Sequence, residues 1–161
     1  MFRILKILLV ATIGVHALLY ALQNIANLGV VVDLMAYVMG NAEHEAYPDS
    51  LFFAVNVPAL HWFAAIVVIA GETAVGLFGL KGAWDMLRAR SGSAEAFHAA
   101  KKCGLWAAGL ALLVWFGFFM TIGATFFQMW QTPVGLGSME GAFMYAVASV
   151  VTMLFVYLTE D

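Results

Sequence analysis

Residues 59–80 read ALHWFAAIVVIAGETAVGLFGL and are apolar along nearly their whole length. A helix that crosses a hydrocarbon core of about 30 Å needs about 20 predominantly apolar residues, and this stretch supplies them. Pro58 stands immediately before it, where a helix start tolerates proline because the missing N–H would have no partner there. The stretch therefore predicts a transmembrane helix that carries one acidic side chain, Glu72, near its middle.

Three further apolar stretches predict membrane spans at about residues 7–28, 104–127 and 141–158. Between the last two, the segment QTPVGLGSMEG at residues 131–141 holds a proline and several glycines, and it predicts a turn. Arg3 and Lys6 precede the first span without a clean small-residue cleavage site after it, so we expect an uncleaved helix. The sequence predicts an all-α integral membrane protein in which residues 1–161 form one domain, a four-helix up-down bundle.

The composition excludes several classes of protein. Hydrophobic residues make up 64% of the chain, charged residues make up 11%, and the mean hydropathy is +0.93. Because a soluble domain usually carries about 25% charged residues, this chain is not a soluble enzyme or a disordered segment. The net charge of -3 and the absence of a basic cluster exclude a nucleic-acid-binding protein, and the single cysteine excludes an internal disulfide.

The distribution of basic residues predicts the orientation in the membrane. All 7 lysines and arginines lie before the first span or in the connection at residues 81–103. The loop at residues 40–57 has none, and it carries Glu43, Glu45 and Asp49. Since lysine and arginine concentrate on the cytoplasmic side, we expect both termini and the 81–103 connection in the cytoplasm and the 40–57 loop outside.

Residues 30–39 stay apolar past the expected end of the first span. They either extend that helix beyond the bilayer or lie along the interface as an amphipathic segment.

Two ionisable side chains within the spans, His16 and Glu72, are candidates for a polar pair. Counted at ~1.5 Å per residue, Glu72 lies ~12 Å and His16 ~14 Å from the cytoplasmic ends of their spans. Because these depths are similar on consecutive antiparallel helices, the two side chains could hydrogen-bond. The pair then either joins two helices or forms a proton-handling or quinone-headgroup site, in which a neutral acid donates and a histidine accepts. A third reading has Glu72 facing a partner subunit.

A second candidate site consists of His61, Trp62 and Trp130 near the outer ends of the second and third spans. The simplest interpretation is a belt of interfacial anchors, and the segment FFQMWQ could also line a quinone or lipid pocket. A haem bound by two histidines needs both at the same depth in the membrane. The depths of His16 and His61 differ by ~10 Å, so the two are poor partners for one haem. His44 from the outer loop is the other histidine that could join His61. The sequence shows no group of His, Cys or acidic residues at the spacing of metal ligands. We therefore expect no metal and no resident cofactor.

Several stretches carry a resemblance to a known family. They are RILKILLVATIGVHALLYALQNI at residues 3–25, AYPDS in the outer loop, the helix with His61, Trp62 and Glu72, and FQMWQ followed by EGAF. On these motifs the chain resembles, nearly end to end, a bacterial family of predicted small integral membrane proteins with a domain of unknown function. The resemblance implies four spans and the bacterial inner membrane, and it implies no activity.

The absence of a catalytic constellation favours a non-catalytic chain. We expect an accessory subunit of a larger inner-membrane complex, respiratory or photosynthetic, whose partners are the lipid bilayer and other membrane subunits. One alternative is a quinone- or haem-binding redox protein that uses His16, Glu72 and His61. The other is a small proton-coupled transporter that uses Glu72, although transporters usually show internal repeats that this sequence lacks.

Overall fold

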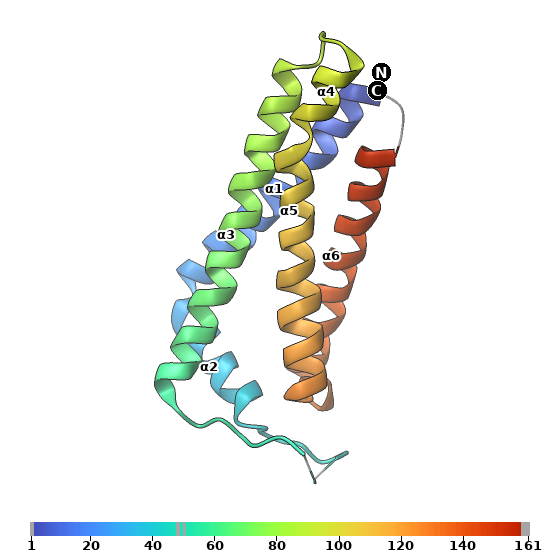
Figure 1. Ribbon diagram of the computed structural model, residues 1–161. Helices are drawn as coiled ribbons and strands as arrows, with labels where there is room; N and C mark the ends of the chain where they lie inside the picture. The colour runs from blue at the N-terminus through green and yellow to red at the C-terminus, as the bar shows by residue number, and fades with distance from the viewer. Residues whose placement is uncertain (1, 48, 50, 159–161) are drawn as a thin grey trace.

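The computed structural model describes residues 2–47, 49 and 51–158, and every regular element in these ranges is helical. The elements, labelled in Figure 1, are α1 (Phe2–Ala26), α2 (Leu28–Met39), α3 (Pro58–Arg88), α4 (Ala94–Ala100), α5 (Lys102–Leu112), the π-helix η1 (Leu113–Phe126), the 3-10 helix η2 (Met129–Gln131) and α6 (Pro133–Leu158).

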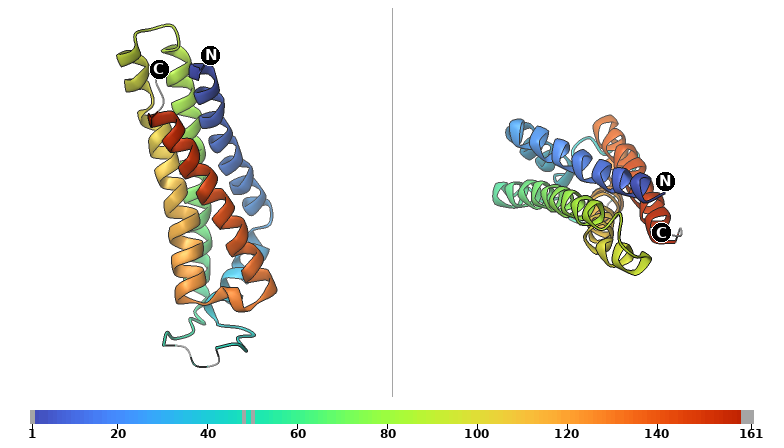
Figure 2. Two further views of the ribbon diagram at one scale, coloured as in Figure 1. Left: turned by 90° about the vertical axis from the view of Figure 1, so that its right-hand side faces the viewer. Right: turned by 90° about the horizontal axis from the view of Figure 1, so that it is seen from above.

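Within the described ranges, four helical segments are long and apolar enough to cross a membrane: Phe2–Ala26, Pro58–Arg88, Ala94–Phe126 and Pro133–Leu158. They run alternately in opposite directions and pack together, which confirms the predicted four-helix bundle (Figure 1, Figure 2). The start of α1, the end of α6 and α4 lie at one end, called here the terminal end. The opposite end, which holds the 40–57 loop, is called the loop end.

The turn predicted at residues 131–141 is much shorter in the structure, and this expectation was wrong. Helix α6 begins at Pro133, so the glycine-rich stretch is helical. The Thr132 hydroxyl accepts a hydrogen bond of 3.1 Å from the backbone N–H of Gly135, which caps the helix. A threonine cap followed directly by proline is a strong helix start, and it outweighs the low helix propensity of the glycines.

Helices α1 and α2 are separated by a bend at Asn27. The Asn27 side-chain amide donates to the backbone carbonyl of Gln23 at 2.8 Å, and such side-chain hydrogen bonds compete with the helix ladder. Beyond the bend, α2 packs against α3 at the loop end. Residues 30–39 therefore form part of the bundle, which neither sequence-based alternative described.

The third span changes from an α-helix to a π-helix at Leu113. The N–H of Phe127 donates to the carbonyl of Ile122, five residues earlier, at 2.9 Å. The hydroxyls of Thr121 and Thr125 also donate to carbonyls five residues earlier, each at 3.1 Å. Nothing in the apolar pattern of this span distinguished a π-helix from an α-helix, and the sequence-based analysis missed it.

Glycines bring α1 and α3 into backbone contact. A Cβ atom built on Gly79 would lie 2.6 Å from the Cα of Gly14 and 2.9 Å from its nitrogen, so only glycine fits. Gly82 approaches Gly104 of α5 in the same way. Close approach through small residues is the usual means of helix association in membranes, where no hydrophobic force drives helices together.

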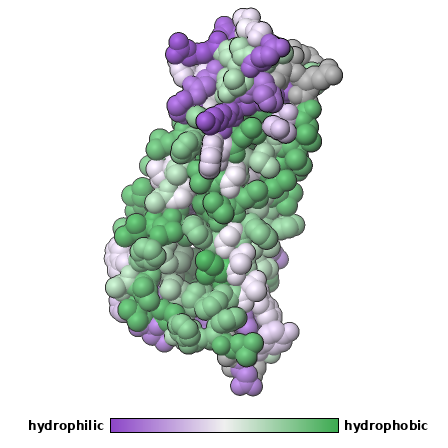
Figure 3. Space-filling model, in the orientation of Figure 1, coloured by the Kyte–Doolittle hydropathy of each residue, from purple (hydrophilic) through white to green (hydrophobic). Residues whose placement is uncertain are grey.

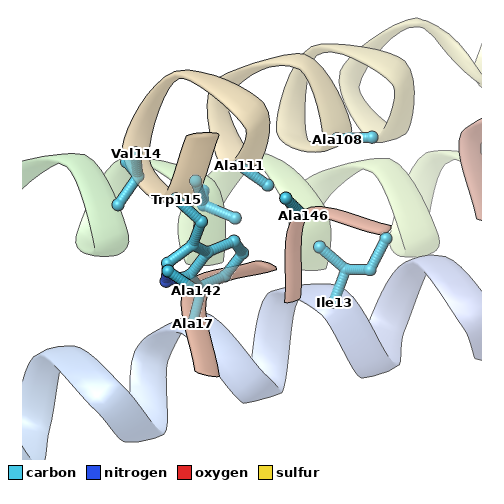
Figure 4. Close-up of a cluster of buried hydrophobic side chains, with 9 residues drawn as sticks. Ile13, Ala17, Ala108, Ala111, Val114, Trp115, Ala142 and Ala146 are labelled. Atoms are coloured by element: carbon cyan, nitrogen blue, oxygen red, sulfur yellow. The ribbon is translucent and has the colours of Figure 1, made fainter. Parts of the chain in front are cut away.

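Small and apolar side chains fill the centre of the bundle (Figure 4). Ala17 of α1, Ala108 and Ala111 of α5, and Ala142 and Ala146 of α6 belong to one buried cluster, in which the Trp115 ring lies beside Ala17 and Ala142. Apolar residues also cover the middle of the face in Figure 3, while hydrophilic residues gather at the terminal end. An apolar exterior of this kind matches a surface in contact with lipid.

We predict that Gly79→Ala destabilises the protein by about 1–3 kcal/mol, because the added methyl group overlaps the backbone of α1. Thermal unfolding in detergent should show a lower midpoint. The control is Gly109→Ala, where nothing lies within 4 Å of the added Cβ and alanine is the better helix former. Equal midpoints for the two variants would show that the α1–α3 contact is loose.

Candidate functional site

Glu72 lies inside the bundle, 1% exposed, near the middle of α3. Its carboxylate oxygens accept hydrogen bonds from one side-chain nitrogen, Nδ2 of Asn24 on α1, at 3.1 and 2.8 Å. Counted at 1.5 Å per residue, Glu72 is about 21 Å from Pro58 and about 24 Å from Arg88. A carboxyl group at this depth is expensive to bury, and in membrane proteins such groups usually mark functional sites.

The structure pairs Glu72 with Asn24 rather than with His16. Gly76 of α3 packs between Gly14 and Leu18 of α1, which puts it at the level of His16. Glu72 lies about 6 Å further toward the loop end, and its side chain meets that of Asn24, which lies about 12 Å beyond His16 along α1. The sequence-based depths were counted from the assumed span ends, whereas α1 begins at Phe2 and α3 ends at Arg88, so the two helices extend by unequal lengths.

His16 belongs to an aromatic cluster on the terminal side of Glu72. Its ring centroid lies 5.0 Å from that of Tyr20, 5.5 Å from Trp115 and 4.5 Å from Tyr145. The hydroxyls of Tyr20 and Tyr145 hydrogen-bond to each other and so connect α1 to α6. The Nε2 atom of His16 is buried and has no hydrogen-bond partner among the described residues.

A chamber of ≈ 430 Å³ opens beside Glu72, and we call it the Glu72 chamber. Its polar lining comes from Glu72, Asn24, Tyr20, Tyr145 and Ser138. The rest of its wall is formed by Val31, Leu34, Met35, Val68, Trp115, Phe119, Pro133, Val134, Gly137, Gly141 and Ala142. Tyr20 and Val134 are 37% and 58% exposed, so the chamber opens to the exterior of the bundle between α1 and α6.

A second chamber of ≈ 320 Å³ adjoins the first toward the loop end, and we call it the apolar chamber. The two share Leu34, Met35, Val68, Phe119 and Ser138 as lining residues. The others are Val38, Met39, Leu60, Phe63, Ala64, Val67, Phe118, Ile122, Gly123, Phe127 and Met129. Ser138 is the one polar residue in this lining, so an almost wholly apolar chamber adjoins one that holds a buried carboxyl group.

The space exists because α1 and α2 separate from α6 toward the loop end. Helix α1 packs extensively on α3 but touches α6 at few positions. The bend at Asn27 then directs α2 along α3, and the glycines 137 and 141 on the facing side of α6 contribute no side chain to fill the gap. The π-helical turns supply Phe118, Phe119 and Ile122 as the opposite wall.

The second predicted site does not gather around a common cavity. His61 is buried at the start of α3, and its Nε2 lies 2.8 Å from the backbone oxygen of Val55. Trp62 is 45% exposed, and Trp130 packs edge-on against Tyr47 with ring centroids 5.2 Å apart. These residues lie at the loop end, and the belt of anchors stays a prediction.

Sequence reasoning found Glu72 but missed the residues that complete its surroundings. Asn24 had a signal, since it belongs to a polar interruption of an apolar span and offers an amide to a carboxylate. Tyr20 and Tyr145 gave no such signal, because a tyrosine in a membrane helix is ordinarily an interfacial or packing residue.

Among the described residues, no group of three or more His, Cys, Asp or Glu side chains is placed to hold a metal ion.

Four apolar spans make up most of the described chain, and the segments between them are short. This architecture defines a small multi-pass integral membrane protein. The chain belongs to the DUF2165 family of predicted small integral membrane proteins, whose family model matches residues 2–159. No curated protein and no solved structure matches the chain. The family membership expected from the motifs is therefore confirmed, and it assigns no activity.

We predict that Asn24→Leu destabilises the protein by about 1–3 kcal/mol, because Glu72 loses its hydrogen-bond donor while it stays buried. The double variant Asn24→Leu/Glu72→Leu should unfold closer to the wild type, since removing both partners leaves no unsatisfied polar group. Thermal unfolding of the four proteins of this cycle measures the coupling. Additive effects of the two substitutions would contradict the hydrogen bond.

Proposed function

We propose that the protein is a non-catalytic membrane protein that binds a small lipid-soluble molecule from the bilayer. The polar group of the ligand lies at Glu72 and its apolar part in the adjoining chamber. The observation that carries this proposal is that two chambers with shared lining residues adjoin each other, one with a buried carboxyl group and the other almost wholly apolar. Ligand sites are typically cavities of about 300–1,000 Å³ with an apolar lining and a few convergent polar groups, and both chambers fall in this range.

The position of the opening supports entry from lipid. Glu72 lies at mid-helix, and the exposed rim of its chamber includes Tyr20 of α1 and Val134 at the start of α6. A molecule dissolved in the hydrocarbon core can reach Glu72 sideways without crossing the headgroup region. A water-soluble substrate has no such route through an apolar exterior.

Of the redox alternatives, the geometry supports quinone binding better than haem binding. His16 lies level with Gly76, so along the bundle it is about 22 Å from His61, and one haem iron cannot bind both. A quinone is lipid-soluble and has a polar head and an apolar tail, so it is one member of the ligand class proposed here.

Two other expectations stay predictions. An accessory subunit of a respiratory or photosynthetic complex would use the exposed aromatic side chains of the bundle, such as Trp106 and Phe116, but these suit lipid equally well. A proton-coupled transporter would use Glu72 and would need the ligand site as its first step. Binding at Glu72 is therefore the step to test first.

We predict that the protein binds tritiated 1-decanol saturably and that Ala64→Phe weakens this binding at least about tenfold. Ala64 lines the apolar chamber, and a phenyl ring there occupies the space of the alkyl chain. Val15→Phe is the matched control, because Val15 is 46% exposed on α1 and lines neither chamber. Scintillation proximity counting on purified, immobilised protein measures the affinity, and equal affinities for the two variants would contradict the proposal.

We propose the bacterial inner membrane as the location, with both termini in the cytoplasm. The support is the concentration of lysine and arginine before α1 and at residues 81–103. A green fluorescent protein fused after residue 161 should be fluorescent, and alkaline phosphatase fused there should be inactive. Alkaline phosphatase inserted in the 40–57 loop should be active, and the reverse pattern would show the opposite orientation.

A further inference from the structure

We infer that the Glu72 chamber selects a lipophilic cation, an alkylated amine or quaternary ammonium compound whose charged head pairs with the Glu72 carboxylate against the rings of Tyr20, Trp115 and Tyr145. This inference rests on the proposed function and names the ligand class of the same site. It depends on three observations: the missing counter-charge, the balance of donors and acceptors, and the aromatic wall.

The chamber contains an acidic group and no basic one. No lysine, arginine or histidine is among its lining residues, and the titratable groups besides Glu72 are the phenols of Tyr20 and Tyr145. Asp33 on α2 is exposed and does not line the chamber. Buried charges in proteins are paired, and in a membrane span the expected partner is an opposite charge. A cationic ligand supplies the charge that the described part of the chain does not.

The Asn24 and Ser138 donors that line the chamber are engaged, whereas acceptor positions remain on Glu72. The Asn24 amide donates to Glu72, and the Ser138 hydroxyl donates to the Val134 carbonyl at 2.9 Å. The two tyrosine hydroxyls bond to each other, which leaves one phenolic hydrogen between them. A carboxylate has about four acceptor positions, and one amide nitrogen does not fill them.

This balance favours a ligand that donates or carries positive charge. A quinone head in its oxidised form offers only acceptors, so it brings neither a donor nor a positive charge to the open acceptor positions of Glu72. A carboxylate or phosphate head would bring a second negative charge next to Glu72. Repulsion between the two like charges disfavours such a ligand.

Aromatic rings line the chamber beside Glu72. The centroid of Tyr145 lies 5.1 Å from that of Tyr20 and 5.5 Å from that of Trp115, so the three rings form one wall. Cations bind over aromatic faces within about 6 Å of the centroid, and recognition of quaternary ammonium groups commonly uses several rings together. His16 contacts all three rings without lining the chamber, and it therefore holds the wall in place.

The test compares three ten-carbon probes that share an alkyl chain: decyltrimethylammonium, 1-decanol and decyl sulfate. On the wild type, decyltrimethylammonium should bind at least about tenfold more tightly than decanol, and decyl sulfate should bind most weakly. Glu72→Gln keeps the shape of the side chain and removes its charge. It should abolish the preference for the cation while decanol binding stays within about threefold of the wild type.

A second pair of variants tests the aromatic wall. Tyr145→Phe keeps the ring and should retain the preference for decyltrimethylammonium over decanol, whereas Tyr145→Leu removes the ring and should reduce that preference. Decanol binding shows in each case that the variant is folded.

The outcomes separate the two proposals. Saturable decanol binding without a preference for the cation, or a preference that survives Glu72→Gln, overturns this inference and leaves the proposed function standing. If neither probe binds the wild type, the proposed function fails as well. Tighter binding of decyl sulfate than of decyltrimethylammonium would show that the site selects the opposite charge.

Discussion

The backbone contact between α1 and α3 determines what surrounds Glu72. Gly14 and Gly79 let the two helices approach until main-chain atoms touch, and this contact sets their register. In that register the Asn24 side chain meets Glu72, while His16 lies against Trp115 and Tyr145. The same sequence with a shift of one helical turn would bring a different α1 residue to the carboxyl group. A packing contact near the terminal end therefore decides the chemistry of a site near the middle of the bundle.

The tight half of the bundle and the open half have different roles. Toward the terminal end, apolar side chains such as Met86, Phe97 and Val156 fill the centre, and glycines bring the helices close together. Toward the loop end, the bend at Asn27, the glycines of α6 and the π-helix separate the helices around two adjoining chambers. The rigid half holds the helices at fixed positions, so the open half can keep a cavity that uniform packing would close. Such a division suits a binding protein, because the polar groups are oriented before a ligand arrives.

The sequence predicted the fold well because the membrane imposes a simple rule. Each span must satisfy its own backbone hydrogen bonds, so apolar length alone indicates a helix, and the four spans follow. Glu72 was equally visible, because an acidic residue in such a span is rare. Its partner was not, because the pairing depends on where helices begin, end and touch, and errors of a few residues at each end change the register. The π-helix and the position of α2 arise from tertiary packing, and the apolar pattern contains no signal for either.

The surroundings of Glu72 also explain how a bundle with so few polar groups can hold a carboxyl group at this depth. The Asn24 amide meets part of the hydrogen-bonding capacity of the carboxyl group, and no basic side chain lines the chamber. A structural ion pair would instead have placed a lysine or arginine against Glu72, and the site would then be closed to other cations. With a neutral donor on one side and a chamber on the other, the carboxyl group is stabilised in the free protein and still has acceptor positions left. This combination is what a reversible site for a positively charged group requires.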